Sequence, residues 1–289
     1  MRRSLVVAAV LVLAAGSLSA SPLTWRPAEV MKPMSFLAYA DFSYVKTTRG
    51  YYWSTETWED LPDESQRTLV RVLPAVYFSP LKNLEAGIVA PVASHSQGDS
   101  SSFGLGDVWF NARYGIIQLP LVPVRLTASA AVVLPTAPED AYPPLGDRTL
   151  DIGAALLLQT RSFAGVAFHA RAGYWLNGSY TLTGGEVDTK VDVGDGLEWL
   201  VKVDYSIVPM VTGWVALGGT TEGNATWEDI EVPNSSSDRA AVWAGVELHP
   251  LPLVDLGLRP KFGYALEPLS KGGAMAPWEA ALDVWVAMP

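Results

Sequence analysis

Residues 107–114, which read DVWFNARY, decide the fold class of this chain. Valine, phenylalanine, alanine and tyrosine take one set of alternate positions, whereas aspartate, tryptophan, asparagine and arginine take the other. Because successive side chains of a β-strand point to opposite faces, the segment predicts a strand with one apolar face and one face of charges and rings. Strands that contact lipid on one side and enclose a lumen on the other have this composition.

The same two-residue period recurs along the rest of the chain. It predicts twelve strands, which are Met34–Lys46, Arg67–Phe78, Leu84–Ala93, Phe103–Ile117, Pro123–Pro135, Arg148–Gln159, Gly165–Leu176, Gly196–Ile207, Val211–Thr220, Arg239–Leu248, Leu253–Leu266 and Trp278–Met288. Short turns near residues 81, 120, 163, 209 and 251 alternate with longer polar stretches. This alternation and the even strand number are typical of bacterial outer-membrane proteins. We therefore predict an all-β fold, a transmembrane antiparallel up-and-down β-barrel of about 12 strands.

A soluble β-sandwich is the alternative fold, since its strands alternate in the same way. The predicted strands are longer than the usual length of about 5–6 residues. Their polar positions also carry large aromatic side chains beside the charges. Both features favour the barrel.

Residues 1–20 have the pattern of a secretory signal peptide. Arg2 and Arg3 supply the positive charge, Leu5–Ala15 the apolar run and Leu18–Ala20 the small-residue cleavage site. The apolar run is shorter than the ~20 residues that cross a bilayer as a helix. We expect residues 21–289 to form one barrel domain in the outer membrane of a Gram-negative bacterium. In this arrangement Ser21–Pro33 is a short leading arm, and both termini are periplasmic.

The composition restricts the function classes. Removal of Arg2 and Arg3 lowers the 20 basic residues to 18 against 30 acidic residues, which gives a net charge of −12. An acidic chain without a basic cluster argues against nucleic acid as a partner. Hydrophobic residues make up 49% of the chain, yet no uninterrupted apolar run of 18 residues follows the signal. A barrel is then the remaining way to satisfy every backbone group in lipid.

The lumen-facing positions are the candidate site. Side chains expected there include Arg113, Arg125, Arg171, Lys202, Arg259, Trp109, Trp175, Trp214 and Trp243. Indole rings stack on other rings and attract cations, so this set predicts binding of a small hydrophobic or aromatic solute. The structural alternative is that a narrow barrel fills its interior with side chains and pairs their charges across strands. The acidic and aromatic loop Thr47–Gln66 could fold inward as a gate or plug, or cover the barrel mouth.

No catalytic, cofactor or metal site is predicted. A hydrolase needs a serine–histidine pair, and only His169 of the three histidines is expected on a lumen face, with no hydroxyl group beside it. The stretch Asp188–Glu198 misses the spacing of a calcium loop. Cysteine does not occur in the chain, so disulfides and thiolate ligands are excluded.

Three short motifs resemble the outer-membrane barrels named for the MetA pathway of phenol degradation. They are residues 104–108 (GLGDV), residues 132–136 (VVLPT) and the pair Gly173-Tyr174. The resemblance implies a barrel of about a dozen strands that passes small hydrophobic or aromatic compounds across the outer membrane. Ala137 replaces the glycine expected after Pro135-Thr136, and the chain ends without a terminal aromatic residue.

We therefore expect an outer-membrane channel or transporter for small hydrophobic or aromatic solutes, and not an enzyme. The expected partners are outer-membrane lipid, the solute and the outer-membrane assembly machinery. The alternative function is a sealed structural or adhesion barrel that binds partners through its outer loops. A planar bilayer distinguishes the two, because a sealed barrel gives no conductance steps.

Overall fold

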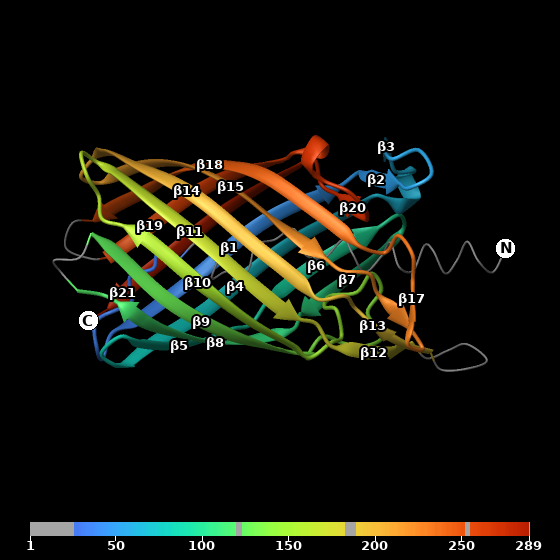
Figure 1. Ribbon diagram of the computed structural model, residues 1–289, viewed down its shortest axis with the longest axis horizontal. Coiled ribbons are helices and arrows are strands. Elements are labelled where there is room, and N and C mark those ends of the chain that lie inside the picture. The colour runs from blue at the N-terminus through green and yellow to red at the C-terminus, as the bar shows by residue number, and fades with distance from the viewer. Residues whose placement is uncertain (1–25, 120–122, 183–188, 252–254, 289) are drawn as a thin grey trace.

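The structure is a computed structural model that describes residues 26–119, 123–182, 189–251 and 255–288, and these form a closed antiparallel β-barrel (Figure 1). The barrel strands are β1 (Phe36–Thr47), β4 (Arg67–Leu81), β5 (Leu84–Val89) continued by β6 (Val92–Gln97), β7 (Ser100–Leu105) continued by β8 (Val108–Ile117), β9 (Val124–Leu134), β10 (Asp151–Thr160), β11 (Val166–Leu176), β14 (Gly196–Val208), β15 (Val211–Glu222), β18 (Ser237–Leu251), β19 (Asp255–Ala265) and β21 (Trp278–Met288). With each continued pair taken as one strand, the barrel has 12 strands, as predicted.

Strand β1 closes the barrel by pairing with β21 on one side and with β4 on the other. Closure removes the unpaired strand edges that an open sheet would present to lipid. The tight turns and the C-terminal strand end lie at one end of the barrel, and the long loops lie at the other (Figure 1). We call these the turn end and the loop end. The predicted turns near residues 120 and 251 fall partly outside the described residues.

Two strands are interrupted at neighbouring positions. Ala90-Pro91 separates β5 from β6, and Gly106-Asp107 separates β7 from β8. Proline has no backbone N–H and cannot donate to a strand ladder. The amide of Gly106 still donates to the carbonyl oxygen of Pro91 at 2.8 Å, so the two interruptions lie side by side. They separate the loop end of the barrel from the part nearer the turn end, where the strands are continuous.

The two faces of the strands differ as the alternation predicts. On the outside, side chains such as Tyr114 and Leu156 are 55% and 54% exposed. On the inside, Arg113 and Thr127 are 1% and 0% exposed. An apolar exterior around a polar and aromatic interior is stable when hydrocarbon surrounds it. No helix within the described ranges is long and apolar enough to cross a membrane.

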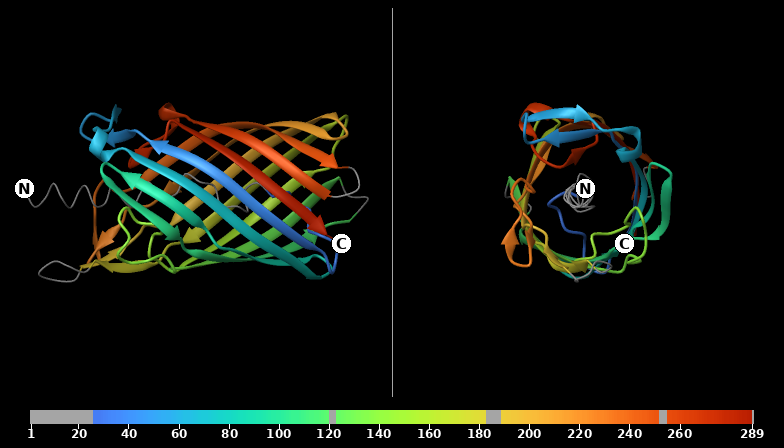
Figure 2. Two further views of the ribbon diagram at one scale, coloured as in Figure 1. Left: turned by 180° about the vertical axis from the view of Figure 1, so that it is seen from behind. Right: turned by 90° about the vertical axis from the view of Figure 1, so that its right-hand side faces the viewer.

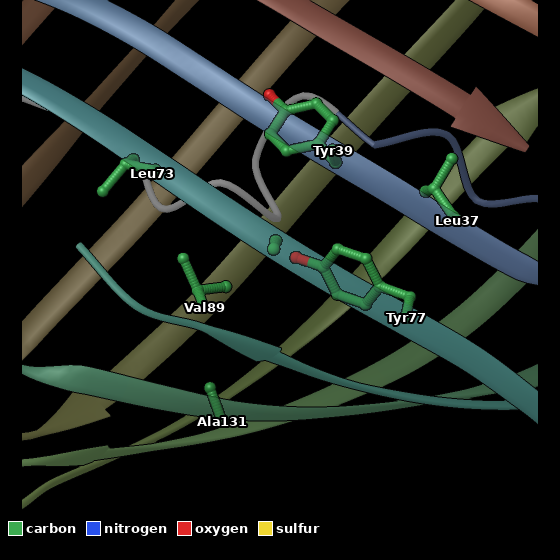
Figure 3. Packing of buried hydrophobic residues seen from close by; sticks show 7 residues of the cluster. Leu37, Tyr39, Leu73, Tyr77, Val89 and Ala131 are labelled. Atoms are coloured by element: carbon green, nitrogen blue, oxygen red, sulfur yellow. The ribbon is translucent and has the colours of Figure 1, made fainter. Parts of the chain in front are cut away.

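One side of the lumen carries a cluster of buried apolar side chains from β1, β4, β5 and β9 (Figure 3). The cluster consists of Leu37, Tyr39, Leu73, Ala75, Tyr77, Val89 and Ala131. Trp109 and Trp175 pack against it from neighbouring strands. This side of the lumen is therefore lined by packed apolar side chains.

Two small sheets form the rim at the loop end (Figure 1). One contains β2 (Arg49–Tyr52), β3 (Thr57–Asp60) and β20 (Ala274–Met275), and the other contains β12 (Ser179–Leu182), β13 (Thr189–Asp192), β16 (Thr226–Trp227) and β17 (Ile230–Glu231). Short 3-10 turns occur at Asp63–Ser65 and Glu267–Leu269. The loop Thr47–Gln66 thus follows the rim rather than plugging the lumen, and Tyr51 packs edge-on against Trp53 and Trp58.

The expected leading arm lies inside the barrel. Residues 26–33, here called the N-terminal arm, run through the lumen at the turn end before β1 begins (Figure 2). The expected signal peptide, residues 1–20, and residues 21–25 lie outside the described part of the chain.

Candidate functional site

A cavity of about 320 Å³ occupies the loop end of the lumen. Its wall comes from strands β1, β4, β6, β8, β9, β10, β11, β14 and β15, and its roof from the inward-folded segment 144–149 and from residues of the rim loops. Pockets that bind small molecules span roughly 300–1,000 Å³. The cavity is therefore large enough for a small solute and too small for a polymer.

The apolar part of the cavity wall contains two indole rings. Trp109 and Trp175 meet edge to face, with ring centroids 6.0 Å apart and planes at 65°. Gly153 lies opposite Trp175 across the β10–β11 pair, and a Cβ atom there would come 2.7 Å from the ring. The glycine therefore leaves the space in which the ring lies. Val133 and Leu73 complete this apolar surface.

Charged groups also line the cavity. They are Arg67, Arg71, Asp107, Asp147, Asp151, Glu198 and Glu222, together with His95. Several of the carboxylates already have protein partners. Arg171 Nε donates to Glu198 Oε1 at 2.8 Å, and Asp151 Oδ1 accepts hydrogen bonds from the Thr149 hydroxyl and the Gly178 amide. These carboxylates have fewer free acceptor positions for a solute, whereas the two indole rings line the cavity.

On the turn-end side of the cavity, Glu85 of β5 holds the N-terminal arm. Arg26 and Arg113 both pair with Glu85 Oε1, and the Met31 amide donates to Glu85 Oε2 at 3.3 Å. Arg113 also donates to the Pro27 carbonyl oxygen, and the Arg26 guanidinium lies over the Tyr77 ring at 4.3 Å. The arm is thus fastened by buried charges to the side of the lumen formed by β4, β5 and β8.

A second group of contacts holds the arm against the adjoining strand β9 and the residue after β8. The side chains of Gln118 and Thr127 both donate to the Ala28 carbonyl oxygen. Arg125 Nη1 pairs with Glu29 at 3.1 Å. The arm therefore lies inside the lumen at the turn end, against the strands from β4 to β9.

Further charges form ion pairs along the other side of the lumen. Asp204 pairs with His169 at 2.5 Å and with Lys202 at 2.8 Å. In a second cluster Lys261 lies 2.7 Å from both Asp41 and Asp283, and Arg259 lies 2.6 Å from Asp283. Lys202 faces the Trp214 ring and Arg259 faces the Trp285 ring. This band of charges lies apart from the cavity.

The structure divides the predicted site residues into three groups. Trp109 and Trp175 line the cavity, with Arg171 held beside it by Glu198. Arg113 and Arg125 bind the N-terminal arm. The other predicted residues, Lys202, Trp214, Trp243 and Arg259, belong to packed clusters elsewhere in the lumen.

Two important residues lie outside the predicted set. Glu85 holds the arm, and Leu145 contributes to the cavity roof. The alternation places Glu85 on the lumen face with Gly87 and Val89, so the period alone contained a signal for it. Leu145 lies in a loop, where no period predicts its direction.

Comparison with solved structures finds the same fold in bacterial outer-membrane proteins. An outer-membrane channel from Pseudomonas putida F1 superposes with a TM-score of 0.78 at 12% identity, covering 93% of this chain and 100% of that chain. The beta domain of the Bordetella autotransporter BrkA has a TM-score of 0.51 at 11% identity, covering 88% of this chain and 98% of that chain. The closed barrel and its fold place this chain in the bacterial outer membrane.

No protein-family model matches the chain, and neither does any curated protein sequence. The resemblance to the barrels of the MetA pathway therefore remains a prediction from short motifs.

Proposed function

We propose that this barrel binds a small apolar or aromatic solute in its outer cavity and passes it across the outer membrane. The observation that carries the proposal is the cavity at the loop end, with the Trp109 and Trp175 rings on its wall. Aromatic side chains offer large apolar contact surfaces and add about 0.5–1.5 kcal/mol per ring pair through their geometry. Engagement of the nearby carboxylates by protein groups favours an uncharged solute over an ion.

The N-terminal arm is the barrier on the proposed route. It lies between the cavity and the turn end, where Arg26, Pro27 and Ala28 contact the lumen wall. Passage of a solute requires this segment to shift, because the surrounding strands form continuous ladders. We expect outer-membrane lipid around the barrel and the outer-membrane assembly machinery as its partner during insertion.

Solute uptake by whole cells tests the proposal. A Gram-negative host without its own aromatic-hydrocarbon channels would express the protein, and entry of a radiolabelled aromatic hydrocarbon would be followed over time. The double variant Trp109→Ala/Trp175→Ala should slow uptake roughly threefold to tenfold, since two ring contacts are lost. Trp214→Ala is the matched control, because Trp214 packs in a separate cluster with Leu200 and Trp243.

Equal uptake by the wild type, the double variant and empty host cells would reject the proposal. The presence of the arm inside the lumen favours a second candidate function. In this function the protein is a sealed structural or adhesion barrel that presents its outer loops to partners. A sealed barrel predicts no conductance steps in a planar bilayer and no solute uptake above the empty host.

A further inference from the structure

The loop between β9 and β10, residues 135–150, folds into the loop end of the barrel. Pro144, Leu145, Gly146, Asp147 and Thr149 all line the cavity. The loop therefore forms part of the cavity roof, beside residues of the rim loops.

Asp107, at the interruption between β7 and β8, fastens this loop at two points. Its Oδ1 accepts a hydrogen bond from the Ala137 amide at 3.0 Å, and its Oδ2 accepts one from the Asp147 amide at 2.9 Å. Hydrogen bonds to a carboxylate are stronger than those between neutral groups. One buried side chain thus joins both ends of the loop to the barrel wall.

The neighbouring residues fit this contact closely. Thr136 Oγ1 accepts from the Val108 amide at 3.0 Å and donates to the Gly106 carbonyl oxygen at 2.9 Å. A Cβ atom on Gly146 would lie 2.0 Å from Asp107 Oδ2. Glycine is therefore required at position 146 for the Asp107 carboxylate to reach the loop.

The middle of the loop is joined to the barrel by side-chain hydrogen bonds. His95 Nδ1 lies 2.8 Å from the Pro144 carbonyl oxygen, and the Ser102 hydroxyl donates to the Pro143 carbonyl oxygen. The barrel strands, by comparison, are joined by long ladders of backbone hydrogen bonds. Loops without such a ladder open at lower free energy than the strands around them.

We propose that Asp107 is a positioning residue that holds the 135–150 loop as a lid over the cavity, and that release of this lid admits the solute. The inference rests on the proposed function for the solute, but the lid itself can be tested separately. It assigns a role to the GLGDV and LPT motifs, residues 104–108 and 134–136, which the structure brings together at this contact.

A single engineered thiol reports on the lid. The chain contains no cysteine, and Val133 is a buried residue of the cavity wall, so Val133→Cys places one thiol under the loop. The rate at which a water-soluble methanethiosulfonate reagent modifies it measures how often the lid opens. Adding Asp107→Asn should raise this rate about tenfold or more, because a hydrogen bond to a charged group is lost.

Two further variants control the experiment. Gly146→Ala should raise the rate as well, since it forces Asp107 and the loop apart. Asp140→Asn, an exposed position of the same loop, should leave the rate unchanged. Heat-modifiable migration on a gel shows that each barrel is folded.

Equal modification rates in all folded variants would overturn the lid. An increase with Asp140→Asn as large as that with Asp107→Asn would also overturn it. The same variants in the whole-cell assay separate this inference from the proposed function. If Asp107→Asn raises the modification rate but no solute uptake is seen, the lid is supported and the proposed solute transport is rejected. Uptake with unchanged modification rates rejects the lid alone.

Discussion

Glu85 and Arg113 form an ion pair closed off from solvent, with Glu85 Oε1 3.1 Å from Arg113 Nη1 and side chains exposed by 0% and 1%. The pair does more than neutralise two lumen charges, because each partner also binds the N-terminal arm. The wall of the barrel and the segment inside it therefore depend on the same carboxylate.

Substitution Glu85→Gln should release the arm and raise the conductance of the barrel in a planar bilayer. Arg26 and Arg113 would then face each other without the carboxylate that separates them, and breaking a buried pair costs about 3–5 kcal/mol. Glu29→Gln is the matched control. The Glu29 side chain is 55% exposed, so its pair with Arg125 contributes only ~0–1 kcal/mol. Indistinguishable conductance in the two variants would contradict this role of Glu85.

Asp283→Asn should destabilise the barrel itself. The Asp283 carboxylate is 0% exposed and lies between Arg259 and Lys261, so its loss leaves two buried cations with less compensation. We expect a loss of about 3–5 kcal/mol in unfolding by urea in lipid vesicles. Asp60→Asn, which removes an 88% exposed partner of Arg49, should change stability little. An Asp283→Asn barrel as stable as the wild type would show that the ion-pair cluster contributes little to folding.

The closed lid should weaken as the pH rises. Burial first, and then the charges of Asp151 and Asp107, raise the pKa of Asp147 to about 8. Arg148 is its neighbour in sequence, and Tyr180 also faces it. The ordinary pKa of an aspartate is near 3.9, so between about pH 4 and pH 8 the closed loop binds more protons than the open one. Closure is therefore favoured at low pH and loses stability as the pH rises through this range.

The thiol reporter measures this effect. The modification rate of Val133→Cys is divided by the rate of an exposed reference thiol, Ser101→Cys, which corrects for ionisation of the thiol itself. This ratio should increase between pH 6 and pH 9. Asp147→Asn should flatten the dependence. A ratio that stays constant with pH in the parent protein would exclude Asp147 as the titrating group of the lid.

The barrel could be predicted from the sequence because lipid and lumen impose opposite chemistry on alternate residues. Segments such as residues 107–114 therefore reveal both their strand and their faces. The rim strands could not be found in this way, since pieces of two to four residues, such as Thr226–Trp227, are too short to show a period. The interruption at Pro91 breaks no period, because the lumen-facing positions stay odd-numbered on both sides of it. At Gly106 the alternation shifts by one residue, from outward Phe103 in β7 to outward Phe110 in β8, so the single expected strand Phe103–Ile117 does not reveal the shift.

The candidate site was predictable only in part. Alternation shows that Trp175 and Trp214 both face the lumen, but it does not show that one lines the cavity and the other packs nearer the turn end. The height of a residue in the barrel depends on strand tilt and register. The partners of Arg113 and Arg125 come from the N-terminal arm, whose inward path no pattern in the sequence indicates.

Anomalous X-ray scattering from crystals soaked in a bromine-substituted benzene would locate the solute site in the barrel. We expect a bromine peak inside the cavity, next to the Trp109 and Trp175 rings, and its loss in the Trp109→Ala/Trp175→Ala variant. Bromine found only on the lipid-facing surface, or still at full occupancy in the double variant, would contradict the claim that these rings form a solute site.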